Sequence, residues 1–250
     1  MEKIFNQIYR KNVWNDPFSR SGTGSNLVQT QKIRIAVPAI IEKYGVKSFL
    51  DIPCGDFFWM KEIQPMLSKS LNSYIGGDIV EELIKINTRQ FSDTKFRFEL
   101  LDIQNSRLPT ADIIFCRDCF VHFSYKDILK AINNIKKSKC KYLLTTTFPG
   151  RKNRNIITGT WFPINLQKFP FNFPKPLEIT EEDCTEYDRS YIDKSIALWQ
   201  IERIPIAKFR IAVLIFSVID TLISITERWK KQATVCLNEI VQYYYQLHLN

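Results

Sequence analysis

Two acidic residues lie in short apolar runs in the first third of the sequence. Asp51 belongs to the run Ser48–Ile52, which Gly55 closely follows. Asp78 belongs to the run Tyr74–Ile79, twenty-seven positions after Asp51, as a strand–helix–strand unit would place it. Open parallel sheets bind ligands at the carboxyl ends of their strands, and a glycine there lets the backbone approach the ligand closely. The pattern predicts a nucleoside site in which Asp51 meets an ammonium group and Asp78 accepts from two ribose hydroxyls.

The turn after the first run contains a single glycine. A nicotinamide-binding protein usually carries Gly-x-Gly-x-x-Gly at this place, but here Asp56, Phe57 and Phe58 fill the turn. Two aromatic rings would crowd a pyrophosphate and the acid would repel it, whereas a cationic sulfonium meets no such repulsion. The turn therefore favours S-adenosylmethionine (SAM) over NAD, although each motif taken alone also fits an ordinary turn or loop.

Strand-like runs alternate with helical patterns along most of the chain. The alternation predicts an α/β fold with a doubly wound, mostly parallel, seven-stranded sheet. The strands are expected at 48–52, 74–79, 95–101, 111–116, 141–147, 177–180 and 194–204, and the helices include 29–44, 81–91 and 126–136. The third strand delivers Asp102, whose carboxylate could accept from the exocyclic amine of adenine.

Three further regions complete the predicted organisation. Residues 1–30 form an N-terminal cap whose glycine-rich loop is either a lid over the cofactor or only a linker, ahead of a core at 31–204. The proline- and aromatic-rich stretch 158–176 is expected to form the wall of an acceptor pocket. Residues 205–250 are expected to form a helical appendage that covers the core or makes a homodimer. Its longest apolar run is too short to span a bilayer, so peripheral membrane contact is the weaker alternative.

Composition narrows the functional classes. The 250 residues carry a net charge of +9 and are 45% hydrophobic, enough for one buried α/β core. No nucleic-acid module is present, so the basic charge favours an acidic small molecule over a polynucleotide. Six cysteines at irregular spacing and no signal peptide indicate reduced thiols and a cytoplasmic protein. The pair Cys116 and Cys119 lacks the further ligands of a zinc site, and no metal is expected.

Several blocks in sequence order resemble a known family. They are Asn12-Val-Trp14, Ser21-Gly-Thr-Gly-Ser25, Asp51-Ile-Pro-Cys-Gly-Asp56, Tyr74-Ile-Gly-Gly-Asp78, Cys116-Arg-Asp-Cys119 with His122, Thr146-Thr-Phe148 and Lys194-Ser-Ile-Ala-Leu-Trp199. Over roughly residues 4–204 the chain resembles class I SAM-dependent methyltransferases. More narrowly, it resembles a small bacterial subfamily partly associated with surface-polysaccharide genes.

The resemblance implies a set of site residues. Cofactor contacts are expected at Asp51, Cys54, Gly55, Asp78, Ile79, Asp102, Ile103 and Arg117. Substrate contacts are expected at Trp14 and Ser21 in the first loop and at Trp161 and Asn165 in the second. Where base and amide N-methyltransferases typically carry Asn or Asp, then Pro-Pro and an aromatic, this chain reads Cys-Arg-Asp-Cys, which disfavours methylation of a nucleic-acid base.

Three residues after the fourth strand are candidates for catalysis. His122 has the pKa range of a general base, although it could equally be a structural residue that caps the next helix. Asp118 is the other candidate base, and Arg117 could bind an anionic acceptor.

We therefore expect a SAM-dependent methyltransferase that modifies a hydroxyl or amine of a sugar, nucleotide-sugar or phosphoramidate precursor of a bacterial capsule or other surface polysaccharide. The alternatives are a nucleotide-dependent oxidoreductase or epimerase, and a non-catalytic protein of the same fold that binds partners through its tail.

Overall fold

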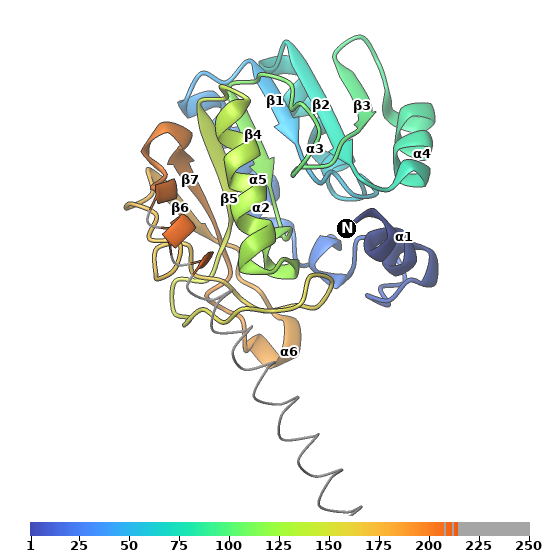
Figure 1. Cartoon of the computed structure of the whole chain (residues 1–250). Helices are drawn as coiled ribbons and strands as arrows, with labels where there is room; N and C mark the ends of the chain where they lie inside the picture. Colours follow the sequence, from blue (N-terminus) through green and yellow to red (C-terminus); the bar gives the residue numbers. More distant parts are fainter. Residues whose placement is uncertain (208, 212, 215–250) are drawn as a thin grey trace, which may run out of the picture. The chain divides into compact units, whose positions relative to one another are not determined.

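A seven-stranded sheet organises the chain (Figure 1). This computed structural model describes residues 1–207, 209–211 and 213–214. The strands are β1 (Ser48–Asp51), β2 (Ser73–Asp78), β3 (Phe96–Leu100), β4 (Ile113–Cys116), β5 (Tyr142–Thr147), β6 (Glu178–Glu181) and β7 (Ser195–Gln200). Their order across the sheet is β3-β2-β1-β4-β5-β7-β6, and β7 runs antiparallel to both of its neighbours. The prediction of a doubly wound, mostly parallel seven-stranded sheet is confirmed.

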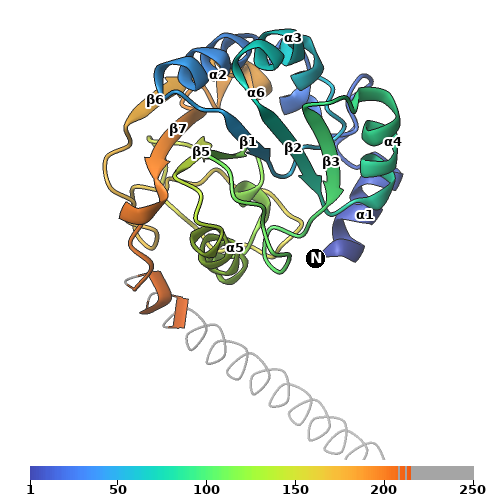
Figure 2. The same cartoon turned by 90° about the horizontal axis from the view of Figure 1, so that it is seen from above.

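Helices cover both faces of this sheet. The helices of the described residues are α1 (Glu2–Lys11), α2 (Gln31–Lys43), α3 (Met60–Ser70), α4 (Glu81–Phe91), α5 (Tyr125–Lys137) and the short α6 (Glu186–Arg189), with 3₁₀ turns η1 (Thr23–Ser25), η2 (Phe120–His122) and η3 (Ile201–Arg203). Figure 2 shows α5 on the opposite face of the sheet from α2 and α3. Because both faces are covered, every residue of β4 and β5 is buried, as expected for central parallel strands.

The sequence of α5 illustrates why these segments are helical. Ser124 caps its N-terminus by accepting from the Asp127 amide at 3.2 Å. The basic residues Lys136 and Lys137 in the last turn complement the helix dipole. Its buried residues recur at helical spacing, at Tyr125, Ile128, Ala131, Ile132 and Ile135. These residues form one apolar stripe that packs α5 against the sheet, and Figure 1 shows α5 in front of β4 and β5.

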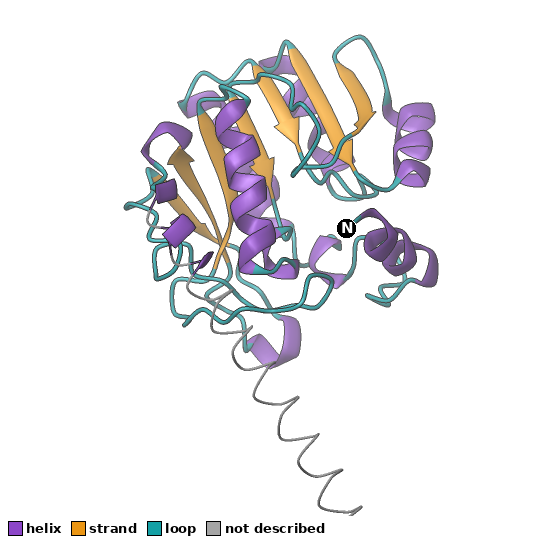
Figure 3. Cartoon of the chain, in the orientation of Figure 1, coloured by secondary structure: helices purple, strands orange, loops and turns teal. Residues whose placement is uncertain are grey.

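The N-terminal segment lies at the carboxyl ends of the parallel strands. Figure 3 shows α1 below the ends of β2 and β3, in the unit formed by residues Met1–Phe209. The predicted strand at 194–204 ends at Gln200, and η3 continues it. Most of the predicted appendage at 205–250, from residue 215 onward, lies outside the described residues. Its predicted roles in a dimer or at a membrane therefore stay predictions. Within the described part of the chain, no helix is long and apolar enough to cross a membrane.

Candidate functional site

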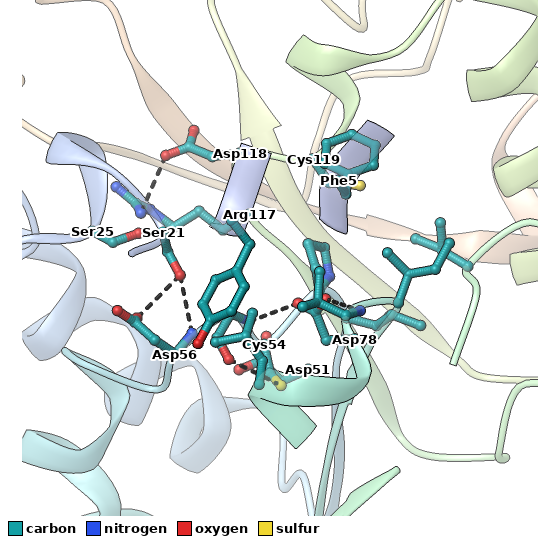
Figure 4. A pocket seen from close by; sticks show the side chains of 18 of the residues that line it. Phe5, Ser21, Ser25, Asp51, Cys54, Asp56, Asp78, Arg117, Asp118 and Cys119 are labelled. Carbon is teal, nitrogen blue, oxygen red and sulfur yellow. Dashed lines mark hydrogen bonds and ion pairs between the residues drawn. The ribbon is translucent and has the colours of Figure 1, made fainter. Parts of the chain in front are cut away.

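A cavity of about 1060 Å³, counting the part open to solvent, lies at the carboxyl ends of β1, β2 and β4 (Figure 4). Fourteen site residues were predicted from the sequence, and most of them line this one cavity. Those that line it are Trp14, Ser21, Asp51, Cys54, Gly55, Asp78, Ile79, Asp102, Ile103, Arg117, Asp118 and His122. Two predicted substrate contacts, Trp161 and Asn165, do not.

The turn after β1 is tied to the end of β2. The Gly55 amide donates to Asp78 Oδ2 at 3.0 Å, and the Asn87 amide group donates to the Gly55 carbonyl at 2.8 Å. Gly55 has a φ of 56°, and a Cβ added there would lie 2.2 Å from Ser21 Oγ. Glycine is required here because the backbone is left-handed and because the N-terminal segment approaches it closely.

Asp78 closes β2 with its carboxylate on the cavity wall. Besides the Gly55 amide, it accepts from the Val80 amide at 2.9 Å. Burial raises the pKa of Asp78 to about 6, although these backbone donors favour its charged form. The carboxylate is thus fixed in place by the backbone and is ionised at neutral pH, with acceptor capacity left for a ligand's hydroxyls.

Asp51 is the most perturbed acid in the cavity. Its Oδ2 accepts from the Tyr74 hydroxyl at 2.5 Å, and its side chain is almost fully buried. Burial, with the neighbouring Asp78, raises the pKa of Asp51 to about 8 against the opposing effects of the Tyr74 hydrogen bond and Arg117. The site therefore disfavours an unpaired negative charge at Asp51. A cationic ligand would provide the positive partner that the Asp51 carboxylate lacks.

Asp102 and Ile103 follow β3 and border the same cavity. The Asp102 carboxylate accepts from the Gln104 amide at 2.8 Å and from Asn105 Nδ2 at 2.7 Å. This turn holds the carboxylate in one orientation, beside the buried side chain of Ile103. The arrangement offers a polar edge and an apolar face to a planar ring.

Arg117 leaves β4 and enters a buried ion-pair cluster, formed by Arg117, Asp118, Glu182 and Lys194. Arg117 Nε and Nη2 contact the Glu182 carboxylate, the latter at 2.6 Å. Nη2 also donates to the Gly24 carbonyl at 2.8 Å, and Nη1 lies 3.2 Å from Asp118 Oδ2. Each guanidinium nitrogen already has a protein partner, so this geometry does not support the predicted contact with an anionic acceptor.

Asp118 is held by the same cluster. Its Oδ2 lies 2.6 Å from Lys194 Nζ, and Thr146 Oγ1 donates to its Oδ1 at 3.3 Å. Despite the opposing effect of burial, Arg117 and Lys194 lower the pKa of Asp118 to about 2. A carboxylate with so low a pKa accepts a proton poorly, so between the two candidate bases the structure favours His122.

His122 ends η2 among aromatic rings. Trp14 lies over it with ring centroids 5.1 Å apart, and Phe5 meets it edge-on at 6.4 Å. Its Nδ1 lies 2.9 Å from the Thr160 carbonyl oxygen, a contact that assigns the proton of the neutral ring to Nδ1 and the lone pair to Nε2. Burial lowers the pKa of His122, so the ring is neutral at pH 7 and can take up a proton.

The loop at 158–176 contacts His122 through Gly159 and Thr160, and it does not line the cavity. The Gly159 amide donates to the His122 carbonyl at 2.8 Å. Trp161 packs edge-on against Tyr191 with centroids 4.7 Å apart, and the Asn165 amide donates to the Pro149 carbonyl at 2.6 Å. No residue of 158–176 is among those that line this cavity, and the expectation that this loop forms the wall of an acceptor pocket stays a prediction.

The N-terminal segment forms one wall of the cavity. Residues 16–25, here called the N-terminal strap, are fastened to Asp56. Its carboxylate accepts from Ser19 Oγ at 2.9 Å, the Arg20 amide at 2.7 Å and Ser21 Oγ at 3.0 Å. Lining residues to which the sequence gave no role at the site include Phe5, Tyr9 and Arg20. The helical spacing of Phe5 and Tyr9 marked one face of a helix, but it did not indicate what that face covers.

The described residues include five of the six cysteines. Cys54, Cys116, Cys119, Cys140 and Cys184 are all buried free thiols. Burial raises the pKa of the Cys54 and Cys119 thiols well above the ordinary value, so both are neutral. Among the described residues, no group of three or more potential ligands could hold a metal ion.

The sequence matches no protein-family model and no curated protein. Solved structures do match. A SAM-dependent methyltransferase from Leishmania major aligns with a TM-score of 0.56 and 13% identity, over 78% of this chain and 83% of that one. Magnesium protoporphyrin IX methyltransferase from Synechocystis PCC 6803, with bound SAM, aligns with a TM-score of 0.53 and 13% identity, over 79% and 95%.

This is the class I methyltransferase fold. The chain also aligns with the methyltransferase domain of bacterial CtHen1 over 66% of that domain, at a TM-score of 0.42. At such low identities the likeness establishes the fold alone. The resemblance seen in the sequence is thus confirmed at the level of fold, while the narrower bacterial subfamily stays a prediction.

Proposed function

We propose that this protein is a SAM-dependent methyltransferase acting on a small polar acceptor. The observation that carries the proposal is the row of acids at the ends of β1, β2 and β3. Asp51, Asp78 and Asp102 border one cavity, in the order that an ammonium group, a ribose and an adenine ring would require. The class I methyltransferase fold supports the same reading.

The residues of the cavity fit this cofactor. Asp51 is a buried carboxyl that gains most from a cationic partner, and Asp78 is ionised with acceptor capacity for two hydroxyls. Gly55 has no side chain of its own, and Ser21 Oγ lies where a Cβ of residue 55 would be. When bound, SAM supplies a methyl group already activated by sulfonium, so the protein chiefly aligns the acceptor and excludes water.

The acceptor needs its proton removed if it is a hydroxyl. His122 Nε2 carries the available lone pair, because Nδ1 is committed to the Thr160 carbonyl. We propose His122 as the general base, with Trp14 and Phe5 packing against its ring. Asp118, fixed by two cations, stays ionised and helps to hold the cluster beside the cavity.

The acceptor is proposed to be a sugar, nucleotide-sugar or phosphoramidate precursor of a bacterial capsule or other surface polysaccharide, modified in the cytoplasm. This finer assignment is supported by the sequence resemblance and by the basic charge of the chain. Within the cavity, the Arg20 side chain on the strap has no ion pair among the described residues, and it is the cation that could meet an anionic acceptor.

Calorimetric titration tests the donor site. SAM and its product S-adenosylhomocysteine (SAH) are expected to bind wild-type protein with micromolar affinity, while NAD does not. Asp78→Ala removes two ribose acceptors and should weaken both adenosyl ligands by about 100-fold or more. Glu62→Ala, on the exposed side of α3, is the control and should bind as wild type does. Binding of NAD in place of SAM would favour an oxidoreductase or epimerase.

A further inference from the structure

Tyr74 is a polar residue in an otherwise apolar aromatic column. Its ring is fully buried on β2, stacked on Phe49 with centroids 5.6 Å apart and on Phe96 at 4.6 Å. Phe57 and Phe98 meet the same ring from other directions, at 5.7 and 6.1 Å. With rings on several sides, the phenol has little freedom to turn, so its hydroxyl is held in one position.

That position is directly against Asp51. The Tyr74 hydroxyl donates to Asp51 Oδ2 at 2.5 Å, and the Asp51 side chain borders the cavity. A phenylalanine would fill the column as well, so packing alone does not account for the hydroxyl. The hydrogen bond reaches from the core to the cavity carboxyl that the proposed function assigns to the cofactor's amino group.

We propose that Tyr74 is a positioning residue that aims Asp51 at the α-ammonium group of the cofactor, and that binding of this cation ionises Asp51 and releases one proton to solvent. The inference rests on the proposed function. To the proposed function it adds a role for Tyr74, which does not line the cavity, and the release of one proton for each cofactor molecule that binds.

The direction of the proton transfer follows from the surroundings of Asp51. The titratable and charged groups near it are Tyr74, Asp78, Cys54 and Arg117. Burial and Asp78 disfavour the carboxylate and raise the pKa of Asp51 to about 8, so the carboxyl is mostly protonated at pH 7. An ammonium group at contact distance favours the carboxylate and lowers this pKa. The O–H bond of the carboxyl breaks, its electrons stay on oxygen, and the proton passes to solvent.

This linkage predicts how affinity depends on pH. Below about pH 8 the cofactor must displace a proton from Asp51, so its affinity rises with pH and levels off above pH 8. The Tyr74 hydrogen bond stabilises the carboxylate, so Tyr74→Phe makes ionisation harder. The variant should bind about tenfold more weakly or worse at pH 7, and its affinity should level off at a higher pH.

SAH is the probe for this test. In SAM the positive sulfonium lowers the pKa of the nearby amino group, which would add a second titration near pH 8, and SAH lacks that charge. Calorimetry at pH 7 in phosphate and in Tris, whose ionisation enthalpies differ, counts the protons released. Wild type should release close to one, and Asp51→Asn, which cannot ionise, should release none. Tyr142→Phe is the control, since it removes a buried tyrosine hydroxyl from β5 outside the cavity lining.

The outcomes separate this inference from the proposed function. SAH binding to wild type without proton release at pH 7, or equal affinity and pH dependence in wild type and Tyr74→Phe, would overturn the role of Tyr74 and Asp51 while leaving the donor site intact. Absence of SAH binding to wild type at every pH from 6.5 to 9 would overturn both. Because the proton count on wild type needs no substitution, a variant that fails to fold does not decide the result.

Discussion

The cavity has two acidic regions that the protein treats in opposite ways. At the ends of β1 and β2, Asp51 and Asp78 are buried without a cation in contact, and their pKa values rise to about 8 and about 6. After β4, Asp118 is paired with Arg117 and Lys194, and its pKa falls to about 2. Figure 4 shows Asp51 and Asp78 together, apart from Asp118.

This difference distinguishes carboxyl groups that are suited to bind a ligand from a carboxylate that supports the structure of the site. A carboxyl left without a cation costs stability until a positive ligand arrives, which is typical of a binding site. A carboxylate neutralised by buried cations has its charge satisfied already, so it contributes to the shape of the site and adds little to ligand binding. Residue type alone does not distinguish the two, whereas the surrounding partners do.

Replacing His122 should have the largest effect on turnover. If His122 is the base, His122→Gln lowers kcat about 10²–10⁴-fold and leaves SAH affinity unchanged. In wild type, rate should fall only as pH drops below the ordinary histidine value, because burial lowers the pKa of His122. The measurement is SAH formation across pH on an acceptor that turns over. A larger loss in Asp118→Asn would break the comparison, since it would make the paired acid the base.

Opening the ion-pair cluster should chiefly affect stability. Glu182→Gln leaves Arg117 with less compensating charge in a buried site and should lower the free energy of unfolding by about 3 kcal/mol. The adjacent and exposed Glu181→Gln is the matched control, with little expected change. Denaturant unfolding measures the difference. If Glu182→Gln were as stable as wild type but lost SAH binding, the cluster would belong to the donor site instead.

The smallest expected effect is on the free energy of unfolding, and it has opposite signs for substitutions of Asp51 and of Asp118. The folded pKa of Asp51 lies above its unfolded value, so the unfolded chain ionises first and ligand-free stability falls from about pH 4 to pH 8. Asp51→Asn should therefore stabilise the free protein at pH 8 by about 1–3 kcal/mol.

For Asp118 the folded pKa is lowered, so its stabilisation is present above about pH 4 and is lost as pH falls toward 2. Asp118→Asn should thus destabilise the protein at pH 8, and Asn tolerates the left-handed backbone at this position, where φ is 50°. Denaturant unfolding at pH 5 and pH 8 checks both signs. Equal signs in the two variants would contradict the division of the cavity.

The sequence predicted that the three acids at the ends of β1, β2 and β3 lie together, because this geometry is local. Successive parallel strands place their carboxyl ends side by side, so Asp51, Asp78 and Asp102 could be brought together from their order alone. Gly55 was recognisable because its turn needs a residue without a Cβ. The strand order and the antiparallel β7 completed a fold that the alternation of elements had already indicated.

The other region depends on contacts between distant parts of the chain. Arg117 pairs with Glu182, 65 positions away, and nothing in either local sequence marks that pairing. Composition identified the loop at 158–176 as ordered and aromatic but gave no direction for its side chains, which pack behind His122. Tyr74 read only as a strand residue, because its hydrogen bond to Asp51 depends on the register of β1 and β2.

One measurement tests the division of the cavity most directly. Carboxyl carbon NMR of the Asp side chains, titrated in free and SAH-bound protein, follows Asp51, Asp78 and Asp118 separately. We expect Asp51 to titrate near pH 8 and Asp78 near pH 6 in the free protein, with Asp118 ionised throughout, and we expect SAH to lower the midpoint of Asp51 by a large amount and to leave Asp118 unchanged. Ordinary midpoints near pH 4 for all three, or an SAH-induced shift at Asp118 and none at Asp51, would contradict the account.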